Sequence, residues 1–113
     1  MSTSYYSIQI YCNTDDYLEI NKILGVKSTD LEPSEIWSYE VTVGEDDKYY
    51  DFISEFMDIL QGNYEKLEKL GIKRSVISLW LIYEYDEQCN MEFDPMNLKR
   101  MGENGIGLCI SCY

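Results

Sequence analysis

The chain has 113 residues, of which 45% are hydrophobic and 14% aromatic, and it carries 21 acidic against nine basic residues. This length suits one domain, residues 1–113, and so much apolar surface excludes a disordered chain in spite of the charge. The net charge of −12 disfavours direct binding to nucleic acid or to anionic membranes. No apolar run reaches the roughly 20 residues that span a bilayer, and the first residues (MSTSYY) lack the pattern of a signal peptide, so we expect a cytoplasmic location.

The first 43 residues alternate between strand and helix patterns. Apolar and polar residues alternate from Tyr5 to Cys12, which predicts a strand with one face in the core. Thr14 as an N-cap, apolar residues at helical spacing and Gly25 as a C-terminal stop predict a short helix. Alternation resumes from Trp37 to Val43 and predicts a second strand.

The middle of the chain predicts two consecutive helices. Residues 45–61 place apolar side chains on one stripe, and residues 64–70 continue at helical spacing after a break at Gly62. We interpret the two as a helical hairpin that returns the chain to the place where it left the sheet.

The last third predicts two more strands around a short helix. Residues 75–85 form the longest alternating segment and are apolar on both faces, which indicates a central strand containing Trp80. Residues 95–101 predict a brief helix that Gly102 closes, and residues 106–110 predict a final strand.

This order of elements predicts an α+β fold, a two-layer sandwich with a four-stranded ferredoxin-like sheet. A single helix between two strands of one sheet makes them parallel, whereas an out-and-back helical pair makes its flanking strands antiparallel. The strand order 4-1-3-2 satisfies both conditions, with helices on one face, the helical hairpin inserted between strands 2 and 3, and Trp37 on the core side of an edge strand. The predicted core contains Ile8, Ile10, Ile20, Phe52, Phe56, Leu79, Leu81 and Leu108.

Negative charge gathers on one face of the predicted helix 45–61. Asp47, Asp51, Glu55 and Asp58 recur at steps of four, four and three, so they share one side of the helix. Like charges at this spacing repel and do not stabilise the helix. Two explanations are open: a solvated face that maintains solubility, or a surface that steers a positively charged partner.

The second face of the predicted sheet is amphipathic and aromatic. Tyr11, Trp80 and Tyr113 fall on it among small polar residues, and Tyr and Trp are enriched in the hot spots of protein interfaces. Either this face is open and binds a partner, or the helical pair covers it and makes a second core.

The sequence offers few groups for catalysis or metal binding. It has no histidine, which removes the commonest general base and metal ligand. Cys109 and Cys112 have the spacing of a redox or zinc motif, but residues three apart in a strand point to opposite faces. The acidic residues between Glu84 and Asp94 lack the spacing and the glycine of a calcium loop. We therefore expect no enzyme activity, no cofactor and no metal site.

Three segments share their order and spacing with a known family. They are residues 19–29 (EINKILGVKST), 36–40 (IWSYE) and 106–113 (IGLCISCY). Together they resemble the bacterial family called domain of unknown function 4279, in which a leucine-glycine helix end and a threonine precede a tryptophan-serine strand start. Ser28 stands where that family usually has proline. The resemblance covers nearly the whole chain and implies a small single-domain protein. Some members of the family are associated with toxin and immunity gene neighbourhoods, and the family supplies no catalytic residues to carry over.

These features favour a binding protein over an enzyme. The leading hypothesis is a cytoplasmic immunity or inhibitor protein that neutralises a basic, nuclease-like toxin domain by stoichiometric binding. The alternative is a ligand-binding or regulatory accessory domain that forms a homodimer through the open sheet face. The predicted partner-binding residues are Asp47, Asp51, Glu55, Asp58, Tyr11, Trp80 and Tyr113.

Overall fold

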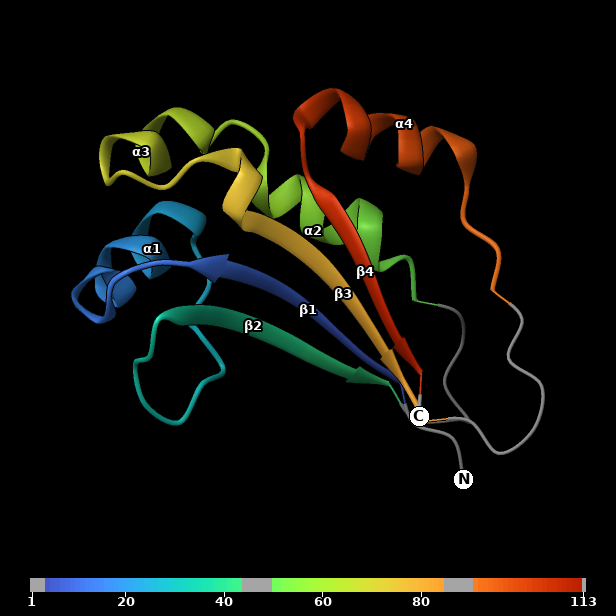
Figure 1. Ribbon diagram of the computed structural model, residues 1–113, viewed down its shortest axis with the longest axis horizontal. Helices are drawn as coiled ribbons and strands as arrows, with labels where there is room; N and C mark the ends of the chain where they lie inside the picture. Colours follow the sequence, from blue (N-terminus) through green and yellow to red (C-terminus); the bar gives the residue numbers. More distant parts are fainter. Residues whose placement is uncertain (1–3, 44–49, 85–90, 113) are drawn as a thin grey trace.

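The computed structural model of the protein describes residues 4–43, 50–84 and 91–112, which form one sheet with helices beside it (Figure 1). The predicted α+β class is therefore confirmed. The sheet contains the strands β1 (Ser4–Tyr11), β2 (Ile36–Val43), β3 (Ile77–Tyr83) and β4 (Gly107–Cys112). The helices of this part of the chain are α1 (Tyr17–Leu24), α2 (Phe52–Leu60), α3 (Tyr64–Lys69) and α4 (Pro95–Asn104), with short 3-10 turns at Thr14–Asp16 and Arg74–Val76.

The strand order is β2-β1-β3-β4, so the predicted order 4-1-3-2 is wrong. β1 runs antiparallel to both β2 and β3, whereas β3 and β4 are parallel. The predicted central strand is confirmed, because Trp80 lies in β3 between β1 and β4. Trp37 is fully buried on an edge strand, also as predicted, but that strand lies next to β1 rather than β3.

The connection between β1 and β2 explains one part of this difference. The helix after β1 was predicted to be a crossover, but Tyr11 lies opposite Ile36, and the Cys12 N–H donates to the Glu35 carbonyl at 2.9 Å. The chain thus re-enters the sheet at the end where it left. α1 has eight residues and spans about 12 Å, and residues 25–35 bring the chain back along it.

The connection between β2 and β3 explains the other part. Val43 lies opposite Ser4 whereas Ile77 lies opposite Ile10, so the chain leaves the sheet at one end and returns at the other. α2 and α3 follow one another along the sheet instead of forming an out-and-back pair (Figure 1). β2 and β3 therefore point the same way, and the two helices form a crossover past β1.

Two helices differ from their predicted bounds. α2 begins at Phe52 rather than at residue 45, because Asp51 is its N-cap: the carboxylate accepts a hydrogen bond from the Ser54 N–H at 3.3 Å. Residues 45–49 of the predicted helix lie outside the described residues. α4 continues through Gly102 to Asn104, and Gly105, with a φ of 72°, forms the left-handed C-cap.

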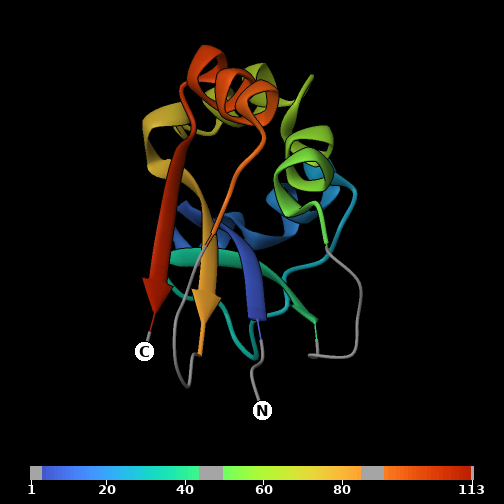
Figure 2. The same ribbon diagram turned by 90° about the vertical axis from the view of Figure 1, so that its right-hand side faces the viewer.

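The hydrophobic core lies between the helices and one face of the sheet (Figure 2). Seven of the eight predicted core residues are buried, and Leu108 is half-buried against the same core. Every helix contributes to it, from Ile20 on α1 to Met101 on α4. The described helices therefore lie on the side of the sheet to which Ile8 and Leu79 point.

Candidate interaction surface

The other side of the sheet forms an open face, made by alternate residues of all four strands. None of its side chains belongs to the core cluster, and the described helices lie on the opposite side of the sheet (Figure 2). The question that the sequence left open is thus decided for this part of the chain, because no described helix covers the face. The open face consists of Tyr5, Ser7, Gln9, Tyr11, Ile36, Ser38, Glu40, Thr42, Ser78, Trp80, Ile82, Cys109 and Ser111.

A row of polar residues crosses the middle of the open face. Ser38, Gln9 and Ser78 lie side by side on β2, β1 and β3. Tyr11 stands on one side of this row and Trp80 on the other, each two residues along its own strand from a member of the row. The two aromatic side chains therefore flank a polar strip whose hydroxyl and amide groups can donate and accept hydrogen bonds.

Trp80 is held in place by its neighbours. Its indole N–H donates to Ser78 Oγ at 2.9 Å. It lies opposite Ser7, which has Glu40 on its other side and is only 4% exposed even though no described helix covers it. We attribute this burial to the cross-strand neighbours Trp80 and Glu40. An indole that is already fixed loses little conformational entropy when a partner binds.

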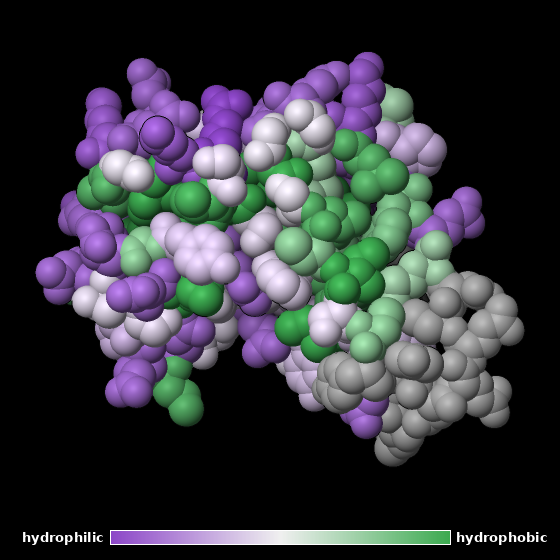
Figure 3. All heavy atoms as spheres, viewed as in Figure 1, coloured by the Kyte–Doolittle hydropathy of each residue, from purple (hydrophilic) through white to green (hydrophobic). Residues whose placement is uncertain are grey.

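Tyr11 is the most exposed aromatic residue of the open face, at 61%. In the orientation of Figure 1, hydrophobic side chains gather over β3 and β4, with hydrophilic residues around them (Figure 3). Glu40 adds an exposed carboxylate on β2. Of the three aromatic residues that the sequence predicted for partner binding, Tyr11 and Trp80 lie on this face, and Tyr113 lies outside the described residues.

Two acids of the predicted acidic face of α2 contact α4. Besides capping α2, the Asp51 carboxylate accepts a hydrogen bond from Asn97 Nδ2 at 2.9 Å. The Asp58 carboxylate pairs with the Arg100 guanidinium at 2.8 Å. Both contacts fasten α4 to α2, so these two acids serve the fold.

Two other members of that acidic series remain. Glu55 is exposed, and its side chain makes no hydrogen bond or ion pair within the described part of the chain. Asp47 lies outside the described residues. The binding role predicted for these four acids therefore stays a prediction.

An acidic groove that the sequence analysis missed lies next to the Tyr11 end of the sheet. It has a volume of about 520 Å³ and lies between α1 and the loop 25–35, with Asp15, Asp30 and Glu32 in its lining. Leu18 and Leu31, which are 80% and 105% exposed, also line it. The only signal in the sequence is the local excess of six acidic over two basic residues between positions 15 and 35.

A hydrogen-bond network holds the loop that forms this groove. The Asp30 carboxylate accepts from the Tyr17 hydroxyl at 2.7 Å and from the Ser38 N–H at 3.1 Å. Asn21 Oδ1 accepts from the Trp37 indole N–H at 2.8 Å. Burial, with the nearby Asp30 carboxylate, raises the pKa of Tyr17 and keeps its hydroxyl protonated as a donor.

The segments that carry the family resemblance have structural places in the fold. Gly25 ends α1 with a φ of 74°, Trp37 bonds α1 through Asn21, and residues 107–112 form β4. Comparison of the chain with protein-family models, with curated proteins and with solved structures found no match. The resemblance to domain of unknown function 4279 therefore stays a prediction.

The acidic residues and cysteines bear on the chemistry open to the described residues. Within residues 4–43, 50–84 and 91–112, no three His, Cys, Asp or Glu side chains are grouped as a metal site requires. No helix in this part is both long and apolar enough to cross a membrane. Cys109 and Cys112 lie three apart on the extended β4, as predicted. Burial raises the pKa of the Cys12 thiol and so keeps it in its weakly nucleophilic form.

Proposed function

We propose that the protein is a stoichiometric binding module of the immunity or inhibitor kind, which neutralises a basic, nuclease-like toxin domain in the cytoplasm. The observation that supports this best is the open face, where Tyr11 and Trp80 flank a polar strip that no described helix covers. Exposed or half-exposed aromatic residues on rigid strands are the kind that most often dominate binding energy.

The charge that attracts a basic partner lies, in this proposal, on Glu40 and around the acidic groove rather than on α2. Asp51 and Asp58 contact α4, whereas Asp15 and Glu32 line the groove between α1 and the loop 25–35. Complementary potentials increase the rate of encounter and reject partners of the wrong charge.

The partner's side chains would meet two kinds of group. Lysine and arginine head groups would pair with Glu40 and Glu32, and their apolar stems or guanidinium planes would pack on the rings of Trp80 and Tyr11. A basic active-site cleft covered in this way is closed to its nucleic acid substrate, so inhibition follows from occupancy alone.

The test of the aromatic contact is binding kinetics with a basic, nuclease-like toxin domain. Trp80→Ala should raise the dissociation constant by about 30-fold, equivalent to about 2 kcal/mol, and chiefly through faster dissociation. Met96→Ala is the matched control, because Met96 is an exposed apolar residue of α4, away from the open face. If Trp80→Ala weakened self-association instead of partner binding, the regulatory alternative would be favoured.

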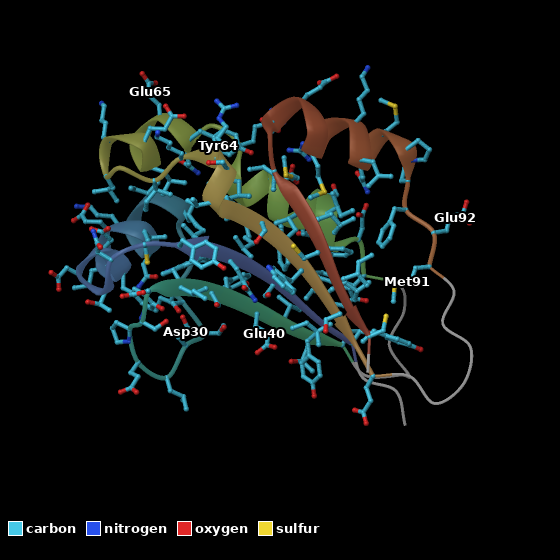
Figure 4. The ribbon with its side chains drawn as sticks, in the orientation of Figure 1. Asp30, Glu40, Tyr64, Glu65, Met91 and Glu92 are labelled. Carbon is cyan, nitrogen blue, oxygen red and sulfur yellow. The ribbon has the colours of Figure 1, made fainter. Side chains whose placement is uncertain are left out.

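Two charge-reversal variants test the proposed electrostatic attraction of the partner. Glu40→Lys should slow association and flatten its salt dependence, because it removes a steering carboxylate from the contact surface. Glu65→Lys makes the same change in net charge on α3, at the opposite side of the molecule (Figure 4), and should leave association nearly unchanged. Equal effects of the two reversals would show that only net charge matters and would refute the proposed surface.

A further inference from the structure

The two edges of the sheet are protected to different degrees. On β2 the backbone groups that point away from β1, from Ile36 to the Glu40 N–H, have partners in the segment that precedes the strand. The Ser38 N–H donates to Asp30, its carbonyl accepts from the Thr29 N–H at 2.9 Å, and the Glu40 N–H donates to Thr29 Oγ1 at 2.9 Å. Ile36 is bonded in the same way through Ser34 and Tyr17. Over these residues the β2 edge is closed to another strand.

On β4 the outward backbone groups belong to Leu108 and Ile110. The backbone N–H and C=O groups of successive residues point to alternate sides of a strand. Those of Ser38 point away from β1, so those of its partner Gln9 point toward β3 and bond Ser78. The backbone groups of the next residue, Leu79, therefore point toward β4. The parallel ladder from Leu79 then uses residues 107 and 109 of β4 and leaves residues 108 and 110 outward. These outward groups make no hydrogen bond in the part of the chain that the structure describes.

The β4 edge is also neutral and apolar. Residues 105–112 (GIGLCISC) contain no charged residue and no proline, the two devices that usually guard an edge strand. Ile110 is 44% exposed, and two more exposed hydrophobic residues, Met96 and Leu98, lie on α4 just before this strand. Green side chains run from α4 down over β4 (Figure 3).

The net charge of the chain and the neutrality of β4 together indicate which molecule binds at this edge. In a chain of net charge −12 most contacts between two copies repel, but a neutral strand can pair with itself without bringing acids together. A basic partner, in contrast, finds no carboxylate on β4 to attract it.

We propose that β4 pairs with β4 of a second copy in an antiparallel arrangement. The two-fold axis runs midway between the two Cys109 residues. In this register Leu108 of each copy lies opposite Ile110 of the other, and their outward groups make four hydrogen bonds. The two Cys109 residues face each other at a non-hydrogen-bonded position. The half-exposed Ile110 side chain is covered by Leu108 of the second copy.

The pairing has a consequence for binding. A two-fold axis perpendicular to the sheet keeps the helices of both copies on one side and joins the two open faces on the other. The dimer is therefore a continuous eight-stranded sheet with two partner surfaces side by side. The inference does not depend on the proposed toxin partner, since it concerns a different surface and another occupant.

The first test is sedimentation velocity of the full chain at concentrations from low to high micromolar, with and without salt. A dimer should form and tighten as salt rises, because salt screens the repulsion between acidic copies; binding of a basic partner should weaken instead. Ile110→Lys should raise the dimer dissociation constant by about tenfold or more. Thr42→Lys makes the same charge change on β2 and should leave the dimer intact.

The second test reads the register from thiol cross-linking. Diamide, which takes up the two electrons and two protons of disulfide formation, is added to a variant that keeps only Cys109, with the other three cysteines changed to Ser. The two Cys109 Cα atoms would lie about 4.5 Å apart, within the range that a disulfide spans, so a covalent dimer should form rapidly. A matched variant with its single cysteine at Ser111→Cys places the thiols roughly 13 Å apart along the strands and should stay monomeric in a denaturing gel.

Hydrogen exchange on the unmodified chain is a third test, which does not depend on the folding of any variant. The amides of Leu108 and Ile110 should exchange fast in dilute solution and become protected as the concentration rises, whereas the Ser38 and Glu40 amides should be protected throughout. A chain that stays monomeric at high concentration and salt would overturn the inference. So would a dimer that survives Ile110→Lys or cross-links equally well through residue 111.

Discussion

Replacing Asp30 by Ala removes the carboxylate that closes the outer edge of β2. Asp30 accepts hydrogen bonds from the Tyr17 hydroxyl at 2.7 Å and from the Ser38 N–H at 3.1 Å, and so joins α1, the loop 25–35 and β2. We expect two effects: a less stable fold, and a β2 edge whose Ser38 N–H is open to pairing with another chain.

The expected loss of stability follows from these contacts. A hydrogen bond to a charged group contributes about 1.5–3 kcal/mol. The Tyr17 hydroxyl keeps the Ile36 carbonyl and the Ser34 hydroxyl as partners, and water reaches the half-buried Ser38, so each loss is partial. Asp30→Ala should therefore lower the free energy of unfolding by about 2–3 kcal/mol and the melting temperature by roughly 10 °C.

The assay is urea unfolding followed by tryptophan fluorescence, with light scattering to detect aggregation. Glu32→Ala is the matched control, since Glu32 lies two residues further along the same loop, is exposed, and makes no hydrogen bond or ion pair in the described residues. A difference between the two variants below about 0.5 kcal/mol would refute the view that Asp30 holds this connection.

Three further predictions concern the core and the buried phenols. Leu79→Ala, at a fully buried position of the central β3, should lower the free energy of unfolding by about 2–5 kcal/mol in the same urea assay. The buried Tyr64 hydroxyl has no hydrogen-bond partner among the described residues, and the Arg74 guanidinium lies 4.3 Å from the centre of the Tyr64 ring. Tyr64→Phe should therefore keep the ring contact and raise the free energy of unfolding by up to about 1 kcal/mol. A loss of stability would show that the hydroxyl has a partner. Burial raises the pKa of Tyr50 and Tyr64 above 10, so the folded state favours the protonated phenols. Stability should be complete below pH 10 and fall above it, seen as a lower melting temperature at about pH 11 than at about pH 8, and less so in Tyr64→Phe.

Local pattern was enough to predict most elements and the core. The strands around Ile8 and Leu79 and the Gly25 helix stop follow from alternation and capping, which depend on residues a few positions apart and act wherever the segment lies. The same alternation predicted Tyr11 and Trp80 for the face opposite the core. These features can therefore be predicted without knowledge of the fold.

Strand order, the acidic groove and the difference between the two sheet edges needed the tertiary structure. Trp37 bonds Asn21 across 16 positions, and Ser38 bonds Asp30 across eight, and these contacts turn the first connection back beside β1. Asp58 was predicted to bind a partner; it is exposed, and it pairs with Arg100 from 42 positions away. No periodicity encodes such contacts, because they are selected by the energy of the whole packed chain, in which a buried polar group is stable only where another segment supplies its partner.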